Sequence, residues 1–284
     1  MEKLTSPKTI HRILGEHDFH FSKHYGQNFL IDANIIEKLL DGANIHEKDV
    51  VLEIGPGIGT MTQYLCERVT HVLAVEIDGR LIPILEETLR EYTNKTILNE
   101  DILKVNLKEE FKKISHKPFK VLANLPYYIT TEIIMGLLES DLPLESITVM
   151  VQREVAERMI ASPGRKDFGA LSVAVQYYSE PEIITIVPKT VFIPQPKVES
   201  AVIHLKILEE PSVQTDRKTF FKVVKAAFSM RRKTLLNCLS SGLTMDKKEV
   251  MELLNLCGID GKRRGETLNL DEFAAIANAI NSKI

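Results

Sequence analysis

The first 150 residues alternate short runs of β-branched and aliphatic residues with helix-like segments. The runs are VVLEI (Val50–Ile54), VLAVE (Val72–Glu76), TIL (Thr96–Leu98), KVLA (Lys120–Ala123) and ITVMV (Ile147–Val151). Such alternation predicts right-handed crossovers and a parallel sheet that is covered by helices on both faces. A helix with Asp32 as N-cap and Gly42 as its end is expected just before the first run. The sequence therefore predicts an open α/β domain.

The pattern changes in the second half of the chain. From Gly169 to Ile207 we expect strands separated by proline-rich turns, with antiparallel strands completing the same sheet. Three helical segments are expected after a linker, and two of them are opened by the capping pairs Asp246/Glu249 and Asn269/Glu272. The expected domains are residues 1–209, an α/β domain with an N-terminal leader and helix, and residues 210–284, a small helical domain.

The composition and charge distribution of the chain limit the classes of partner that it can bind. No apolar run approaches the roughly 20 residues of a membrane span, and the first residues lack the order of a signal peptide, so we expect a cytoplasmic protein without a membrane contact. Three widely spaced cysteines and no paired histidines predict no metal site. The net charge of -3 divides into +6 from Arg217 onward (13 Lys+Arg, 7 Asp+Glu) and -9 before it (23 and 32). A basic end favours a polyanion partner, although solvated helix faces would look the same.

A glycine-rich turn follows the first strand. Gly55, Gly57 and Gly59 in VLEIGPGIGTMT let the backbone approach a ligand that lies across the carboxyl end of the sheet. Glu76, 21 residues after Gly55, ends the next strand, where a carboxylate can accept both hydroxyl protons of a ribose. Asp101 follows the third strand. Acidic or glycine positions at three consecutive strand ends predict a nucleoside site.

The spacing of the glycines separates the nucleoside classes. Thr60 stands where a dinucleotide site has its third glycine, and no lysine follows to make a phosphate-binding P-loop. Glu53, on the strand before the turn, is badly placed for a pyrophosphate and suits a ligand with a cationic amino-acid portion. The pattern resembles the S-adenosylmethionine (SAM) site of class I methyltransferases.

The stretch NLPYYIT ends the fourth strand. If a methyl sulfonium lies over the glycine turn, the side-chain oxygen of Asn124 and the carbonyl of Leu125 can accept hydrogen bonds from an exocyclic aromatic amine. Pro126 fixes the turn and Tyr127 offers a face on which the base stacks. The base must leave its stack, so the expected substrate is single-stranded or flipped nucleic acid, and Phe192 is the candidate for the second stacking ring. An ordinary proline turn and a buried Phe192 are the simpler alternatives.

Several further motifs resemble those of one family. GQNFLID, VEID, NEDIL, VQREVAERM, VFIPQPKVESAVI, FSMRRKTLLN and KRRGETLNLDEFA, with the glycine turn and NLPY, are similar to the bacterial small-subunit (16S) ribosomal RNA adenine dimethyltransferases. The resemblance implies a Rossmann-like SAM-dependent methyltransferase domain with a mostly parallel seven-stranded sheet and a small all-α C-terminal domain. It also implies dimethylation of the N6 amino groups of two adjacent adenosines in the 3′-terminal hairpin loop of small-subunit rRNA, late in subunit assembly.

The same resemblance implies roles for individual residues. Asn28 and Leu30 would flank the methionine end of SAM, Gly55 and its neighbour Gly57 would approach it, and Glu76 would hold the ribose. Asp101 would bind the adenine amino group, Ile102 would lie beside the ring, and Asn124 would face the methyl. Tyr128 is a departure, because many members have asparagine there.

Two basic clusters are candidates for rRNA contact. They are Arg231, Arg232 and Lys233, which would fan around about 200° of a helix, and Lys262, Arg263 and Arg264. The expected partner is rRNA within the immature 30S subunit, and no heptad or apolar edge argues for more than a monomer. Two alternatives stay open: an enzyme that dimethylates large-subunit rRNA, and an assembly factor that uses the fold to bind an immature subunit.

Overall fold

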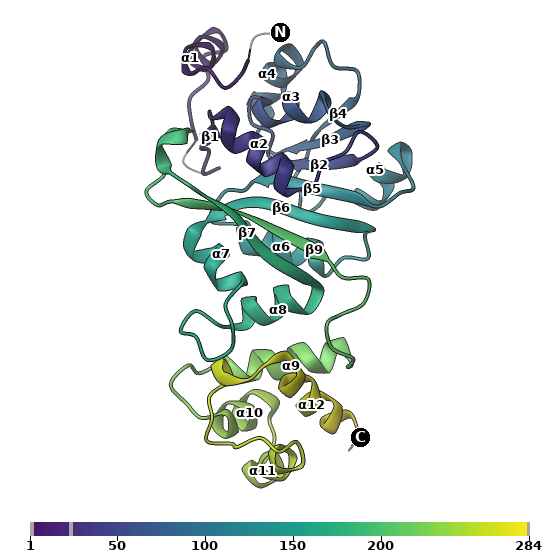
Figure 1. The fold of residues 1–284 in the computed structure, drawn as a ribbon, viewed down its shortest axis with the longest axis vertical. Coiled ribbons are helices and arrows are strands. Elements are labelled where there is room, and N and C mark those ends of the chain that lie inside the picture. The colour runs from purple at the N-terminus through teal and green to yellow at the C-terminus, as the bar shows by residue number, and fades with distance from the viewer. Residues whose placement is uncertain (1–2, 23–24, 283–284) are drawn as a thin grey trace. The chain divides into compact units, whose positions relative to one another are not determined.

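A computed structural model describes residues 3–22 and 25–282 of the chain (Figure 1). It contains two compact units. Unit 1 is Met1–Ala156 with Glu182–Ile207, and unit 2 is Glu157–Pro181 with Leu208–Ile284. The second unit therefore takes in residues 157–181, which the sequence predicts to be part of the α/β domain.

Unit 1 is built on a seven-stranded sheet in the order β4-β3-β2-β5-β6-β9-β7. The strands are β2 (Val50–Ile54), β3 (His71–Glu76), β4 (Lys95–Asn99), β5 (Phe119–Asn124), β6 (Leu144–Gln152), β7 (Ser179–Val187) and β9 (Ser200–Ile207), of which β7 begins in unit 2. Neighbours from β4 to β6 are parallel and β9 is antiparallel to β6. The prediction of a mostly parallel sheet with antiparallel strands at one end is confirmed.

Helices lie beside the strands of unit 1 (Figure 1). They are α1 (Pro7–Glu16), α2 (Ala33–Gly42), α3 (Thr60–Cys66), α4 (Ile82–Thr88), α5 (Leu107–Ile114) and α6 (Thr130–Leu138), with the short 3-10 turn η1 (Gly79–Leu81). The Asp32 side chain accepts hydrogen bonds from the backbone N–H groups of Asn34 and Ile35, as expected for an N-cap. Four apolar residues of α2 then pack in one cluster with the sheet residues Val51 and Leu122. Burial of one helix face is thus what attaches α2 to the sheet.

A two-stranded sheet completes unit 1. Strand β1 (Phe29–Leu30) pairs antiparallel with β8 (Phe192–Ile193), which follows the 3-10 turn η2 (Lys189–Val191). Phe29 also packs with the apolar face of α1 and with Ile58 of the glycine turn. The residues before α2 are thereby fixed beside the carboxyl ends of the central strands.

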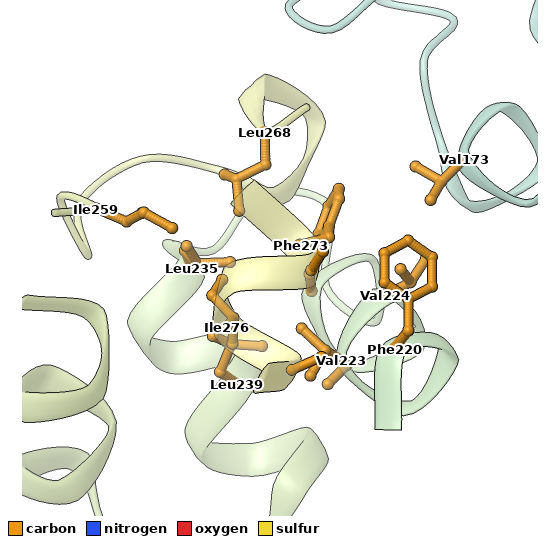
Figure 2. Close-up of a cluster of buried hydrophobic side chains, with 14 of the residues drawn as sticks. Val173, Phe220, Val223, Val224, Leu235, Leu239, Ile259, Leu268, Phe273 and Ile276 are labelled. Carbon is orange, nitrogen blue, oxygen red and sulfur yellow. The ribbon is translucent and has the colours of Figure 1, made fainter. Parts of the chain in front are cut away.

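Unit 2 is helical. Its helices are α8 (Ala170–Tyr178), α9 (Arg217–Ala227), α10 (Leu235–Leu243), α11 (Lys247–Leu256) and α12 (Leu270–Asn281), with the 3-10 turn η3 (Gly265–Thr267), while α7 (Arg153–Met159) crosses the division between the units. Figure 2 shows the core, where Phe220 and Phe273 pack among aliphatic side chains of the other helices. The ring of Tyr177 stacks on Phe220 with centroids 4.8 Å apart.

Two sequence predictions were wrong in this unit. The segment 170–178 was expected to be extended and is helix α8: the Ser172 hydroxyl caps its start by accepting from the Gly169 N–H, and Val173 and Tyr177 enter the helical core. Tertiary burial here outweighs the β-propensity of a valine-rich stretch. The helix α10 was not expected, because LLNCLSSGL combines leucines with residues that favour turns.

Candidate active site

One pocket of unit 1 lies at the carboxyl ends of the parallel strands and has an empty volume of about 1110 Å³, its open mouth included. Its walls come from residues 25–30, from the glycine turn after β2, from the end of β3 and from the turns after β4 and β5. The predicted site residues among its lining are Asn28, Leu30, Gly55, Gly57, Glu76, Asp101, Ile102, Asn124, Leu125, Pro126 and Tyr127. Positions almost 100 residues apart in sequence are thus brought to one cavity.

The glycines of the turn differ in what they face. Gly55 and Gly57 both have left-handed φ angles, +69° and +62°. A Cβ on Gly55 would meet nothing within 4 Å, whereas a Cβ on Gly57 would lie 3.0 Å from the Phe29 ring. Gly55 therefore leaves open space for a ligand, and Gly57 permits close packing against β1.

Glu53 lies one residue before the end of β2 and lines the pocket with only 1 % of its surface exposed. No hydrogen bond from the described residues reaches its Oε2 atom. Burial, with a smaller contribution from the charge of Glu76, raises the pKa of Glu53 to about 8. A buried carboxyl oxygen without a donor fits a cationic group, and the open space at Gly55 fits the backbone of such a ligand.

Glu76 ends β3 and is held by the backbone. Its Oε1 accepts from the N–H of Asp78 at 2.9 Å, and its Oε2 accepts from the N–H of Gly57 at 3.2 Å. Burial raises the pKa of Glu76 to about 7, although these two hydrogen bonds favour the charged form. Each oxygen has a second lone pair, so the carboxylate can still accept the two hydroxyls of a ribose.

Asp101 and Ile102 stand in the turn after β4. One carboxylate oxygen of Asp101 accepts from the N–H of Leu103 at 3.1 Å, and the other lies 3.3 Å from the Lys104 ammonium. The turn therefore fixes the carboxylate, and Ile102 supplies an apolar surface of the pocket beside it. An acceptor next to an apolar surface suits the amino edge and the ring face of an adenine.

The side chain of Asn124 is oriented by the wall opposite it. Its Nδ2 donates to the backbone carbonyl of Asn28 at 2.8 Å. Only the NH₂ group of an amide can donate to a carbonyl, so the Oδ1 atom is left as an acceptor. The turn itself is held by the N–H of Leu125, which donates to the carbonyl of Met150 at 3.2 Å, and by Tyr127, whose hydroxyl lies 2.7 Å from Ser200 Oγ. A fixed amide oxygen beside a half-buried ring is the arrangement that the sequence predicted for an amine substrate.

Phe192 does not line this pocket. Its side chain is 2 % exposed and packs in the cluster that contains Leu30, Val202 and the apolar face of α2. In this structure the ring is therefore not at the pocket, because β8 pairs with β1 and turns the ring into the core. The aromatic residues that do line the pocket are Tyr25, Phe29, Tyr127 and Tyr128.

The basic residues of unit 2 differ in whether their side chains have a hydrogen-bond or ion-pair partner. Arg231, Arg232 and Lys233 are exposed but lie in the turn between α9 and α10, so their predicted fan around a helix is wrong. The turn closes through a hydrogen bond from the N–H of Lys233 to the carbonyl of Met230. The Arg231 guanidinium donates to the carbonyl of Lys166, whereas Arg232 and Lys233 have no side-chain partner among the described residues.

Arg263 and Arg264 form the second basic group. Both guanidinium nitrogens Nη1 and Nη2 of Arg263 donate to the carboxylate of Glu272, and Nη2 also donates to the carbonyl of Thr267. This bidentate pair lowers the pKa of Glu272 through the hydrogen bonds that it provides. Arg263 is therefore occupied in holding α12, while Arg264 is exposed and 4.0 Å from Glu266.

Several residues that line the pocket had no role predicted from the sequence. Gln27 and Phe29 lie within GQNFLID and Tyr25 directly precedes it, whereas only Asn28 and Leu30 have a predicted role there. Tyr128, which the sequence marks only as a departure from the family's asparagine, lines the pocket and is 63 % exposed. No spacing rule marks these positions, because they reach the pocket through the antiparallel pairing of β1 with β8 and through the turn after β5.

Comparisons with known proteins show the family of the chain. The sequence profile of the family described as ribosomal RNA adenine dimethylase matches residues 18–281. The chain belongs to this ribosomal RNA adenine dimethylase family. It is 53 % identical over the full length of both chains to the ribosomal RNA small subunit methyltransferase A of Alkaliphilus oremlandii. It is 49 % identical to the enzyme of the same name from Clostridioides difficile, over 100 % of this chain and 99 % of that one.

Solved structures agree on the fold. A dimethyladenosine transferase from Plasmodium falciparum superimposes with a TM-score of 0.77 at 24 % identity, over 90 % of this chain and 98 % of that one. The 23S rRNA methyltransferase ErmE superimposes with a TM-score of 0.70 at 26 % identity, over 89 % of this chain and all of that one. The protein is thus an enzyme of the ribosomal RNA adenine dimethylase family with a Rossmann-like methyltransferase fold.

No helix within residues 3–22 and 25–282 is both long and apolar enough to cross a membrane.

Proposed function

We propose that the protein uses SAM to dimethylate the N6 amino groups of two adjacent adenosines in the 3′-terminal hairpin loop of small-subunit rRNA, within the immature 30S subunit. The observation that carries the chemistry is the Asn124 amide, which is anchored through its NH₂ group and leaves its oxygen as an acceptor in the pocket. The target follows from the full-length similarity to small-subunit methyltransferases. Because the proposed substrate is ribosomal, we propose that the protein acts in the cytoplasm, and that it acts as a monomer.

The cofactor contacts follow the lining of the pocket. Asn28 and Leu30 would flank the methionine end of SAM, Gly55 would approach it, and the buried Glu53 would receive the ammonium group. Further along the same cavity, Glu76 would accept the ribose hydroxyls and Asp101 the adenine amino group, with Ile102 beside the ring. When bound, SAM supplies an electrophilic methyl group.

The residues of the turn after β5 act on the amine. In adenine the lone pair of the N6 nitrogen is delocalised into the ring, so the amine is a poor nucleophile. Hydrogen bonds from its two N–H groups to Asn124 Oδ1 and to the Leu125 carbonyl would localise the lone pair on nitrogen as the N–C bond forms and the bond between the methyl carbon and the sulfonium sulfur breaks, its electron pair staying on sulfur. After transfer, a proton leaves the nitrogen, and one N–H remains for the second methylation. A general base is not required before the attack.

The adenosine must leave its stack to reach this turn. Tyr127 offers it a fixed face, because its hydroxyl is tied to Ser200. A stacking role for Phe192 remains a prediction, and it requires the ring to leave the core in which it is packed.

Unit 2 would bind the rRNA backbone. We propose that Arg231, Arg232, Lys233 and Arg264 contact phosphates without reading sequence, because they are exposed on a region of positive net charge. Arg263 would support this surface through its ion pair with Glu272 rather than contact RNA directly. Shape of the hairpin and the flipped base would then supply the specificity.

The test is methyl transfer from labelled SAM to small and large ribosomal subunits from unmethylated cells, followed by mapping of dimethyladenosine. We expect label in the 3′-terminal hairpin of the small subunit and at least a hundredfold loss with Asn124→Ala, as on removal of a group that stabilises the transition state. Asn94→Ala is the matched control, because the Asn94 amide holds two backbone carbonyls outside the pocket. Label in the large subunit would refute the target, and tight subunit binding without label would favour the assembly-factor alternative.

A further inference from the structure

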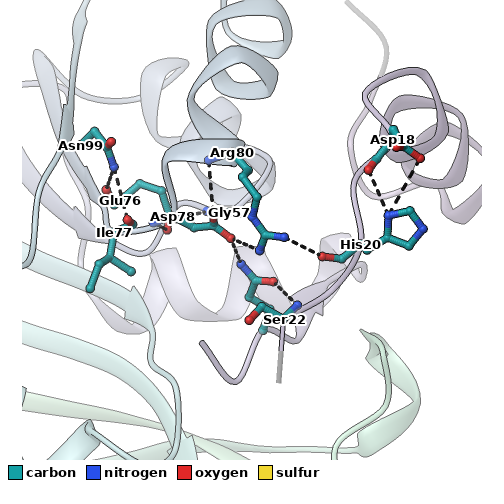
Figure 3. Close-up of polar contacts among 10 residues, drawn as sticks. Asp18, His20, Ser22, Gly57, Glu76, Ile77, Asp78, Arg80 and Asn99 are labelled. Carbon is teal, nitrogen blue, oxygen red and sulfur yellow. Dashed lines mark hydrogen bonds and ion pairs between the residues drawn. The ribbon is translucent and has the colours of Figure 1, made fainter. Parts of the chain in front are cut away.

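Asp78 is a buried carboxylate whose residue is hydrogen-bonded to Glu76 and to Gln27, which line the pocket from two different segments; Figure 3 shows its polar contacts. Its side chain is 3 % exposed. Oδ1 accepts from the backbone N–H and from Nε of Arg80 at 3.1 and 2.9 Å, and Oδ2 accepts from Nη2 of Arg80 at 2.6 Å and from Nε2 of Gln27 at 2.7 Å. Burial acts to raise the pKa of Asp78, but these hydrogen bonds outweigh it and the pKa is lowered. The carboxylate is therefore ionised and fully bonded.

The first wall is the end of β3. The N–H of Asp78 donates to Oε1 of Glu76, the carboxylate that we assign to the ribose. The carbonyl of Glu76 in turn accepts from the Asn99 amide at 2.8 Å (Figure 3). A displacement of Asp78 would thus move one of the two donors that orient the Glu76 carboxylate.

The second wall is the segment that precedes α2. Gln27, which donates to Asp78, also accepts from the N–H of Ser22 at 3.0 Å. Arg80 donates to the carbonyl of His20 at 3.3 Å, and its guanidinium lies 5.0 Å from the centroid of the Phe19 ring. Asp78 therefore holds the segment on both sides of residues 23 and 24, directly through Gln27 and indirectly through Arg80.

The same segment orients the amide of the catalytic turn. Asn28, the residue after Gln27, supplies the carbonyl that accepts from Asn124 Nδ2. Hydrogen bonds of 2.9 and 2.7 Å thus link Glu76 to Asp78 and Asp78 to Gln27. The peptide unit after Gln27 leads to Asn28, whose carbonyl accepts the 2.8 Å hydrogen bond from Asn124. Arg80 alone would already neutralise Asp78, so the Gln27 contact is not needed to stabilise the buried charge.

We propose that Gln27 and Asp78 are positioning residues that hold the ribose-binding carboxylate and the catalytic amide in register with each other. The proposal rests on the proposed function, since it takes Glu76 and Asn124 in their assigned roles. A rigid link of this kind fixes the distance between the bound cofactor and the amine acceptor, on which the rate of an in-line transfer depends. Neither residue touches the reacting atoms.

Three variants of the full chain separate positioning from folding. Gln27→Ala removes the link and keeps the Asp78–Arg80 pair. Gln27→Glu keeps the shape but places a second carboxylate against Asp78. The control is Asp49→Asn, which weakens the ion pair between Asp49 and the buried Lys120, a pair outside the pocket with an O–N distance of 2.8 Å. Each variant is compared below its own melting temperature by calorimetric titration with SAM and by single-turnover methyl transfer at saturating SAM.

We expect Gln27→Ala to weaken SAM binding and to slow the single turnover about tenfold, the effect of losing one hydrogen bond to a charged group. Gln27→Glu should bind SAM more weakly and transfer the methyl group more slowly than Gln27→Ala. Asp49→Asn should lower only the melting temperature. Equal affinities and rates in wild type and both Gln27 variants would overturn the proposal, as would a Gln27→Glu enzyme that works as well as wild type. A wild-type protein that binds no SAM would instead refute the cofactor assignment, so the two failures are distinguishable.

Discussion

Binding of the cofactor should release protons near neutral pH, because the pocket buries two carboxyl groups with raised pKa values. Glu53 has a pKa of about 8 and Glu76 of about 7. At pH 7 the free protein then carries about 0.9 of a proton on Glu53 and about 0.5 on Glu76. An ammonium group at Glu53 and ribose hydroxyls at Glu76 both favour the ionised forms. Saturation with SAM at pH 7 should therefore release roughly 0.9 to 1.4 protons.

The sign of the linked pH dependence is fixed by the direction of these shifts. Because its pKa is about 8, Glu53 in the folded protein keeps its proton up to about that pH, whereas in the unfolded chain it has its ordinary pKa of 4.5. Between these values the folded state binds more protons, so the contribution of Glu53 to stability falls as pH rises. The pH dependence of SAM binding has the opposite sign, because SAM favours the ionised carboxylate. The affinity for SAM should rise with pH and level off above about pH 8. The Cys66 thiol, whose pKa burial raises to about 12, stays neutral throughout.

The assay is titration calorimetry in buffers of different ionisation enthalpy, where the slope of observed against buffer enthalpy gives the number of protons released. Glu53→Gln should lower that number by about 0.9 at pH 7 and flatten the dependence of affinity on pH. A wild-type slope of zero, with SAM bound, would refute the assignment of Glu53 to the ammonium group. A slope that Glu53→Gln leaves unchanged would refute it equally.

Three further outcomes test other parts of the molecule. The double variant Arg232→Ala/Lys233→Ala should weaken subunit binding and reduce the slope of log affinity against log salt by about 1.5. Alanine at the exposed Lys247 and Lys248 removes the same charge and should leave this slope unchanged. Equal slopes for both double variants in a filter-binding series would contradict the phosphate contacts. Phe220→Ala should lower the free energy of unfolding by about 3–5 kcal/mol in denaturant titrations, because the fully buried ring leaves a cavity. Tyr128→Ala should raise KM for the subunit more than it changes kcat if this exposed ring contacts RNA at the pocket mouth; unchanged KM would exclude that contact.

Local sequence patterns predicted the sheet well because each strand is defined by its own residues. The run Val50–Ile54 is strand β2 with the bounds expected, and Asp32 caps α2 as expected. Parallel strands then bring their carboxyl ends to one edge, so the convergence of Glu76, Asp101 and Asn124 followed from the order of the strands. These predictions needed no knowledge of contacts between distant segments.

The errors arose where packing between segments decides the conformation. The stretch 170–178 has the residues of a strand, but Val173 and Tyr177 are buried against Phe220, more than 40 positions later, and this burial favours a helix. Phe192 sits in a proline-rich loop that the sequence cannot orient, and pairing with β1 decides that the ring enters the core.

The link from Gln27 to Asp78 shows the same limit at the site itself. A sequence shows that both residues are polar and that one follows Glu76 by two positions, but their contact spans 51 positions and depends on the course of residues 25–30 along the pocket. Spacing rules describe groups at the ends of neighbouring strands, such as Glu76 at the end of β3 and the glycine turn after β2. They cannot describe a carboxylate that is buried by one segment and bonded by another. The proposed coupling between Glu76 and Asn124 therefore rests on a contact that the tertiary structure reveals and the sequence does not.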